Sequence, residues 1–190
     1  MRIGVDLDGV VYDSETFLKA EAELLDLEIG GKGLVNPGEW SVSKRHNWPE
    51  EVYTTLQKRV RLKAIDNSPV MPLAKKVLDM LSKEGHLLYA ITTRGEFVFE
   101  EIKHTKKALR RDKIKFDKMI FTQSGKLGPC QENKIDIMID DRPKTIKELS
   151  KNGVLCFYFR AAELPKINNE NVITVYNWGQ IYRHIKNLNK

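Results

Sequence analysis

Two aspartates near the N-terminus, Asp6 and Asp8, are the residues of this sequence best suited to chemistry. They lie in the segment DLDGVVYD, directly after residues 1–5, which open a short apolar strand. Side chains two positions apart on an extended backbone point to the same side, so the two carboxylates are expected to lie close together. Like charges at short range repel each other unless a cation or a proton lies between them. The pair therefore indicates a metal site or an acid/base pair, and Gly9 allows a tight turn beside a ligand.

Two later strands are also expected to end in polar side chains. The apolar runs 87–91 and 135–139 would form these strands. The residues that follow the two runs are Thr92, Thr93 and Arg94 in the first case and Asp140 and Asp141 in the second. The carboxyl ends of parallel strands meet at one edge of a sheet, where ligands bind, so we expect all these groups to gather there. Three or four carboxylates form a hard oxygen site that suits Mg²⁺ better than zinc.

The composition bounds the class of protein. The chain has 190 residues, 41% of them hydrophobic and 31% charged, as in a globular protein with one core and a small accessory unit. No apolar run approaches the roughly 18–20 residues that span a bilayer, and acidic residues interrupt the first apolar stretch before a signal peptide could form. Cys130 and Cys156 have no CxxC spacing and indicate packing in a reducing compartment. We therefore expect a cytoplasmic protein without membrane contact.

The net charge of +6 favours an anionic partner only weakly. Much of it comes from one stretch that contains Lys103, Lys106, Lys107, Arg110, Arg111, Lys113, Lys115 and Lys118. Such a stretch forms either a nucleic-acid patch or a solvated helix face. The helix face is favoured, because no aromatic residues alternate with these charges to stack bases. Nucleic acid is therefore not expected as a partner.

The elements that must position these groups alternate along the chain. The expected strands are 2–7, 87–91, 118–121, 135–139, 154–159 and 172–175, and the expected helices between and after them are 73–81, 98–109, 143–150 and 178–188. In the first of these helices, Leu73, Val77, Met80 and Leu81 have the spacing of one buried face. Strands alternating with helices predict an α/β fold, a Rossmann-like parallel sheet with helices on both faces.

The segment 14–67 interrupts this alternation. It begins with an acidic helix, 15–28, and continues through a glycine-rich turn and the loop Asn36-Pro37-Gly38. A second helix follows Pro49. We interpret the segment as a small helical insertion that lies over the end of the first strand.

Four motifs in this order resemble those of the haloacid dehalogenase-like phosphatases. They are DLDGVVYD, ITTR at 91–94, a lysine before the fourth strand, and DIMIDDRP at 136–143. DLDGV together with IMIDDRP is most similar to the 5'-nucleotidase and 5'(3')-deoxyribonucleotidase branch. The resemblance implies a catalytic core of residues 1–13 and 68–190 and places the insertion, 14–67, where type-1 caps of this superfamily occur.

The resemblance also implies a role for each matched residue. Asp6 matches the nucleophile and a metal ligand, and Asp8 matches the general acid/base, with its backbone carbonyl on the metal. Thr92 matches the hydroxyl that binds the phosphoryl group, and Asp140 and Asp141 match the remaining ligands of Mg²⁺. Which of the last two binds the metal directly stays open.

The lysine of the third motif is either Lys126 or Lys134. Lys126 lies fourteen residues before Asp140, which leaves room for a short helix before the strand. Lys134 directly precedes the strand and is expected to point to solvent. We therefore choose Lys126 as the catalytic and phosphate-binding lysine.

Several residues near the motifs have two readings. Thr93 and Arg94 are candidate phosphate ligands, although Arg94 would equally suit an ion pair with a surface acid. Asp13 is expected to cap the helix that follows. The aromatic residues of the insertion, Phe17, Trp40, Trp48 and Tyr53, either stack a nucleobase or form its own small core. The core reading is favoured for each, and Trp40 is the best candidate for contact with a base.

The expected function is that of a Mg²⁺-dependent phosphomonoesterase working through an aspartyl-phosphate, with a small phosphorylated substrate, in particular a nucleoside monophosphate. The related branch usually has Thr-Ser-Pro where this chain has Thr92-Thr93-Arg94, which leaves the deoxyribonucleotide preference open. The alternative is a phosphatase for a sugar phosphate, another small metabolite or a polynucleotide end. A non-catalytic binding module would predict damage to the catalytic residues, and none is visible.

Overall fold

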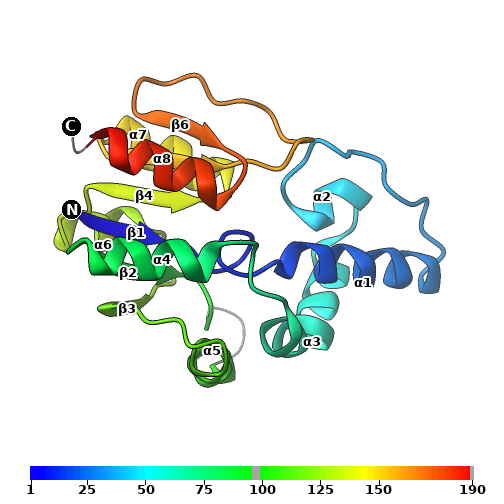
Figure 1. Ribbon diagram of the computed structural model, residues 1–190. Helices are drawn as coiled ribbons and strands as arrows, with labels where there is room; N and C mark the ends of the chain where they lie inside the picture. Colours follow the sequence, from blue (N-terminus) through cyan, green and yellow to red (C-terminus); the bar gives the residue numbers. More distant parts are fainter. Residues whose placement is uncertain (96–98, 189–190) are drawn as a thin grey trace.

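The computed structural model describes residues 1–95 and 99–188 and has a parallel β-sheet at its centre (Figure 1). Six strands run in parallel in the order β3-β2-β1-β4-β5-β6. They are β1 (Arg2–Val5), β2 (Leu87–Thr92), β3 (Lys118–Phe121), β4 (Ile137–Asp140), β5 (Leu155–Phe159) and β6 (Val172–Val175). This arrangement confirms the predicted α/β class with a parallel sheet.

Helices cover both faces of the sheet. They are α4 (Ala74–Lys83), α5 (Glu100–Arg111), α6 (Leu127–Glu132), α7 (Pro143–Lys151) and α8 (Trp178–Leu188). Buried side chains of α4, α5 and α8 form one hydrophobic cluster with the strands, and those of α6 and α7 form a second cluster. The alternating apolar and polar positions of these helices thus produce two cores, one on each face.

Most expected elements are present, with differences at their ends. β1 ends at Val5 instead of residue 7, because the backbone turns there and the Leu7 carbonyl accepts hydrogen bonds from Val11 and Tyr12. Leu73 was expected on the buried face of its helix, but it lies before α4 with a φ of 68° and is 54% exposed. Val98, expected in the next helix, lies outside the described residues.

Three helices lie between β1 and α4: α1 (Ser14–Glu28), α2 (Val42–His46) and α3 (Glu50–Asn67). Figure 1 shows them beside the sheet, on the side to which the β4 arrow points. They have their own hydrophobic cluster, against which the aromatic residues Phe17, Trp48 and Tyr53 pack. Asp13 caps α1 as predicted, since its carboxylate accepts a hydrogen bond from the Thr16 backbone N–H. The short helix α2 was not predicted.

Two further findings concern the cysteines and the expected lack of membrane-spanning segments. Cys130 and Cys156 are both buried and free, as packing residues would be. Among the described residues, no helix has the length and apolar character needed to cross a membrane.

Candidate functional site

The candidate site lies at the carboxyl end of β1, between its two neighbouring strands. β1 pairs with β2 on one side and with β4 on the other, and Val5 is in register with both Ala90 and Ile139. The connections leave β1 in opposite directions at this point, which opens a crevice beyond the carboxyl ends of the strands. The short loops after these strands therefore bring the first, second and fourth motifs together.

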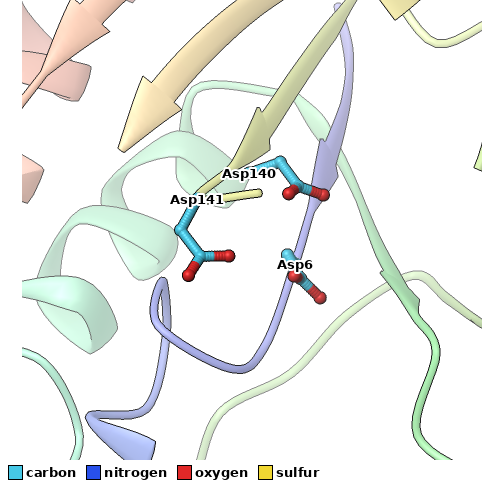
Figure 2. A group of neighbouring side chains, drawn as sticks. All are labelled: Asp6, Asp140 and Asp141. Carbon is cyan, nitrogen blue, oxygen red and sulfur yellow. The ribbon is translucent and has the colours of Figure 1, made fainter. Parts of the chain in front are cut away.

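Three aspartates converge in this crevice (Figure 2). One carboxylate oxygen from each of Asp6, Asp140 and Asp141 lies within 4.8 Å of the other two. Asp6 follows β1, whereas Asp140 and Asp141 come from the end of β4. All three side chains are buried or nearly so. The expected meeting of these distant carboxylates at one sheet edge is therefore present.

Asp6 is held by one cation and one backbone donor. Its Oδ1 lies 2.8 Å from Nζ of Lys126, and the same oxygen accepts a hydrogen bond of 2.8 Å from the Leu7 N–H. Burial raises the pKa of Asp6 to about 6, against the opposing effect of Lys126, and the charges of Asp140 and Asp8 add to the rise. The carboxylate thus carries a charge that its surroundings only partly offset.

Lys126 connects the first motif with the fourth. Its Nζ donates a 2.6 Å hydrogen bond to Oδ2 of Asp140, while Oδ1 of Asp140 accepts one from the Arg142 N–H. Burial lowers the pKa of Lys126, but Asp140 and Asp6 more than reverse this and hold it above its usual value. Lys134, the alternative third-motif lysine, is exposed at the end of α6.

Asp8 has different surroundings from Asp6. Arg94 binds it bidentately, with Nε 3.0 Å from Oδ2 and Nη2 2.7 Å from Oδ1, and Nη2 of Arg61 lies 3.1 Å from Oδ2. Burial raises the pKa of Asp8, but Arg94 and Arg61 outweigh it and hold this pKa well below its usual range. The carboxylate of Asp8 is therefore not part of the aspartate cluster. Asp8 nevertheless lines the same cavity as Asp6, and its charge contributes to the raised pKa of Asp6.

Of the polar residues at the end of β2 and directly after it, some lie in the crevice and others in the interior. Arg94 is buried, and besides Asp8 it donates a hydrogen bond to the Thr105 hydroxyl. It is not among the residues that line the cavity described below, and its partner is Asp8 of the first motif instead of the surface acid that the alternative foresaw. Thr92 is also buried, with its Oγ1 accepting from the Arg94 N–H, and Thr93 lines the cavity.

A cavity of about 850 Å³ lies over the cluster, between the sheet edge and α1–α3. Asp6, Asp8, Lys126 and Asp141 line it from the sheet, and Trp40, Tyr53 and Arg61 are among the residues that line it from the inserted segment. Such a volume suits a small organic ligand.

Two charged residues of the site, Arg61 and Glu101, were not identified from the sequence. Arg61 extends from α3 to Asp8, and its Nε lies 3.4 Å from Oε2 of Glu101, a fully buried acid on α5. Oε2 of Glu101 also accepts a hydrogen bond from the Gly95 N–H. Arg61 lies on a helix with many charges, and no motif marks it, so no sequence signal distinguishes it from its neighbours.

The donor set of the cluster suits a hard divalent cation. It consists only of carboxylate oxygens, which such cations prefer. Burial, followed by the charges of Glu15 and Asp140, raises the pKa of Asp141 well above its usual value. A bound cation would offset this repulsion. Asp6, Asp140 and Asp141 are the residues that would hold it.

No family model matches the chain. A nucleotidase from Clostridium acetobutylicum is 22% identical over 189 residues, which cover 99% of this chain and 95% of that protein. Among solved structures, a haloacid dehalogenase-like hydrolase from Streptococcus pneumoniae has a TM-score of 0.69 at 15% identity, covering 97% of both chains. A predicted phosphatase from Clostridium acetobutylicum has a TM-score of 0.68 at 20% identity, covering 98% of both. The chain therefore has the fold of the haloacid dehalogenase-like hydrolases.

Proposed function

We propose that this protein is a Mg²⁺-dependent phosphomonoesterase that forms an aspartyl-phosphate on Asp6. The observation that carries the proposal is the convergence of Asp6, Lys126, Asp140 and Asp141 beneath a cavity of about 850 Å³. Phosphoryl transfer requires positioned charges of this kind around the phosphoryl oxygens. The names of the similar proteins, hydrolase and phosphatase, support the same chemistry.

In the first step a carboxylate oxygen of Asp6 attacks phosphorus, and the bond from phosphorus to the ester oxygen breaks. Asp8 gives its proton to the departing oxygen. In the second step Asp8 takes a proton from water, which attacks the aspartyl-phosphate and releases inorganic phosphate. Lys126 offsets charge on the phosphoryl oxygens, and Thr92 and Thr93 are candidates to hold them. When bound, the divalent cation supplies further charge neutralisation.

The surroundings of Asp8 favour its second role. Between Arg94 and Arg61 it is ionised, and in that form it accepts a proton from water. For the first step Asp8 needs a proton of its own. A movement of Arg61 together with α3 would remove one of the two cations and raise the pKa of Asp8 towards the value that step requires.

Nucleoside monophosphates are the proposed substrates. The nucleotidase of similar sequence covers nearly the whole chain, and the cavity has room for a base and a sugar. A sugar phosphate or another small phosphorylated metabolite would use the same chemistry. A panel of nucleotides and sugar phosphates separates the two, and higher kcat/KM values for nucleotides across the panel support the first.

The chemistry is tested with p-nitrophenyl phosphate, which carries no base. The native protein is expected to hydrolyse it with Mg²⁺ and to lose this activity in excess EDTA. Asp6→Asn should lower kcat to the background while the circular dichroism spectrum stays unchanged. Persistent turnover in this variant would remove Asp6 as the nucleophile.

A further inference from the structure

One side chain of the inserted segment, Trp40, contacts two consecutive residues at the end of β4. Its indole Nε1–H donates a hydrogen bond to Oδ2 of Asp141, with the two atoms 3.3 Å apart. The guanidinium carbon of Arg142 lies 4.9 Å from the centre of the indole ring, in a cation–π arrangement. Trp40 is thus fixed by its edge to Asp141 and by a face to Arg142.

The carboxylate of Asp141 is confined on two sides. Gly9, with a φ of 70°, brings the backbone of the first motif so close that a Cβ there would lie 2.4 Å from Oδ2. The indole of Trp40 closes a second side of the same oxygen. Within residues 1–95 and 99–188, Trp40 is the hydrogen-bond donor to this carboxylate. Both contacts thus involve Oδ2 of Asp141.

We propose that Trp40 is a positioning residue for the metal centre: its indole N–H fixes the Asp141 carboxylate in the orientation that binds the divalent cation. The inference rests on the proposed function, because it assigns a metal to the aspartate cluster. A small cation such as Mg²⁺ demands near-ideal geometry, so the orientation of each ligand affects its affinity. Hydrogen-bond partners behind the ligands supply that orientation.

This role differs from packing in the core of the segment, which was the favoured expectation for Trp40, and from contact with a base, which was the alternative. Base stacking uses the face of an aromatic ring and needs no N–H group. The Arg142 guanidinium already covers one face of this ring, and the N–H is directed at Asp141. A positioning role predicts equal effects on substrates with and without a base, whereas stacking predicts effects on nucleotides alone.

The inference also links the inserted segment to the chemistry. Trp40 precedes α2, whereas Asp141 follows β4, so the hydrogen bond joins residues 101 positions apart. When the segment moves away from the sheet, Asp141 loses its donor. Metal affinity is therefore expected to be highest with the segment in the position seen here.

The test is Mg²⁺ binding measured by isothermal titration calorimetry, without substrate. Trp40→Phe keeps an aromatic ring for Arg142 and removes only the donor. Loss of a hydrogen-bond partner of a metal ligand typically costs 10- to 100-fold in affinity, so the Kd for Mg²⁺ should rise about tenfold. With p-nitrophenyl phosphate, the Mg²⁺ concentration for half-maximal activity should rise by the same factor.

Trp48→Phe is the matched control. The Nε1–H of Trp48 also donates to an aspartate, at 2.6 Å from Oδ1 of Asp26, but this pair lies inside the inserted segment and away from the cluster. This variant should bind Mg²⁺ as the native protein does, even where its thermal stability falls. An equal loss of affinity in both variants would indicate a general loosening of the segment and overturn the inference.

A double-mutant cycle shows whether Trp40 acts through Asp141. In an Asp141→Asn background, Trp40→Phe should change the Kd for Mg²⁺ by less than twofold. A full tenfold change in that background, or an unchanged Kd in the single Trp40→Phe variant, contradicts the inference. If the native protein binds Mg²⁺ and hydrolyses phosphate esters in those cases, the proposed function stands without it. Absence of Mg²⁺ binding to the native protein overturns both.

Discussion

Asp6 and Asp8 are separated by a single residue and yet contact different cations. Lys126 contacts Asp6 within the aspartate cluster, whereas Arg94 and Arg61 contact Asp8. Their pKa values consequently move in opposite directions, to about 6 for Asp6 and well below the usual range for Asp8. Neighbouring carboxylates with opposite shifts are typical of sites where two acids have different roles.

Lys126 is expected to be essential for both activity and stability. Lys126→Ala leaves Asp6 and Asp140 buried without their shared cation. Breaking a buried ion pair on one side typically costs about 3–5 kcal/mol, and we expect a loss of this size in metal-free denaturant unfolding. We expect kcat to fall by about 100-fold or more, as when a group that stabilises transition-state charge is removed.

The matched control for this prediction is Lys134→Ala. Lys134 is exposed, and exposed substitutions usually change stability by less than about 0.5 kcal/mol. Comparable losses in the two variants would show that the contacts of Lys126 with the aspartates have no special role.

The raised pKa of Asp6 predicts a pH-dependent stability difference. Because this pKa is about 6 in the folded protein and 3.8 for an unperturbed aspartate, ionisation is unfavourable in the fold. Protonated Asp6 therefore favours the folded state. This contribution to the free energy of unfolding is fully present below about pH 4 and is lost as the pH rises through 6. Asp6→Asn, which cannot ionise, should therefore raise the Tm of the metal-free protein by a few degrees more at pH 7.5 than at pH 4.5. Differential scanning calorimetry in EDTA measures these Tm values. An equal change in Tm at both pH values would contradict the prediction.

The sequence identified the site residues that belong to motifs and missed those that do not. Asp6, Asp140 and Asp141 follow apolar runs, and this pattern alone indicates a sheet edge. The partners of Asp8 were harder to predict from the sequence. Arg94 had two equal readings, and Arg61 depends on how α3 packs against α5, which no local pattern encodes.

At the scale of elements, the strands were the most predictable part of the fold. Their apolar runs are bounded by turn residues, and a strand buried on both faces needs such a run. The ends of the elements were harder to predict. Leu73 was expected inside a helix, but it is exposed and lies before α4, because its backbone has a non-helical φ of 68°. Helix α2, with five residues, is too short to show a periodic pattern.

Helix α3 is the element that joins the inserted segment to the catalytic residues. Its Arg61 contacts Asp8 and Glu101, whereas Arg59, two positions earlier, pairs with Glu28 inside the segment. Arg61→Ala leaves the fully buried Glu101 without this cation, which should lower stability by about 2 kcal/mol or more. Hydrogen–deuterium exchange should become faster in α3 and α5, because their contact is weakened.

Arg59→Ala serves as the control on the same helix. Its side chain is 41% exposed and forms an ion pair with Glu28, and such pairs contribute little to stability. Exchange in α5 should match that of the native protein. If Arg59→Ala accelerates exchange in α5 as much as Arg61→Ala does, the contact with Glu101 is not what holds the two helices together.

At the scale of the whole molecule, the site depends on parts of the chain that are far apart in sequence. Asp6, Lys126 and Asp141 come from three loops of the sheet, and Trp40 and Arg61 come from the inserted segment. These groups meet only when the sheet is formed and the segment is docked. Binding of a cation at the cluster should therefore stabilise the entire fold, since a ligand that binds only the folded state adds to its stability.

Mg²⁺ is accordingly expected to raise the Tm of the native protein. At a concentration about 100 times the Kd, the gain is about 2.7 kcal/mol, which corresponds to about 5–10 °C for a chain of this length. The gain should shrink as the pH falls below about 6, because the proton on Asp6 then competes with the cation. Differential scanning calorimetry with MgCl₂, against NaCl at equal ionic strength, measures it. Asp141→Asn should lose most of the gain, whereas Asp79→Asn, which removes a half-exposed acid on α4, should retain it. An equal gain in both variants would place the bound cation outside the aspartate cluster.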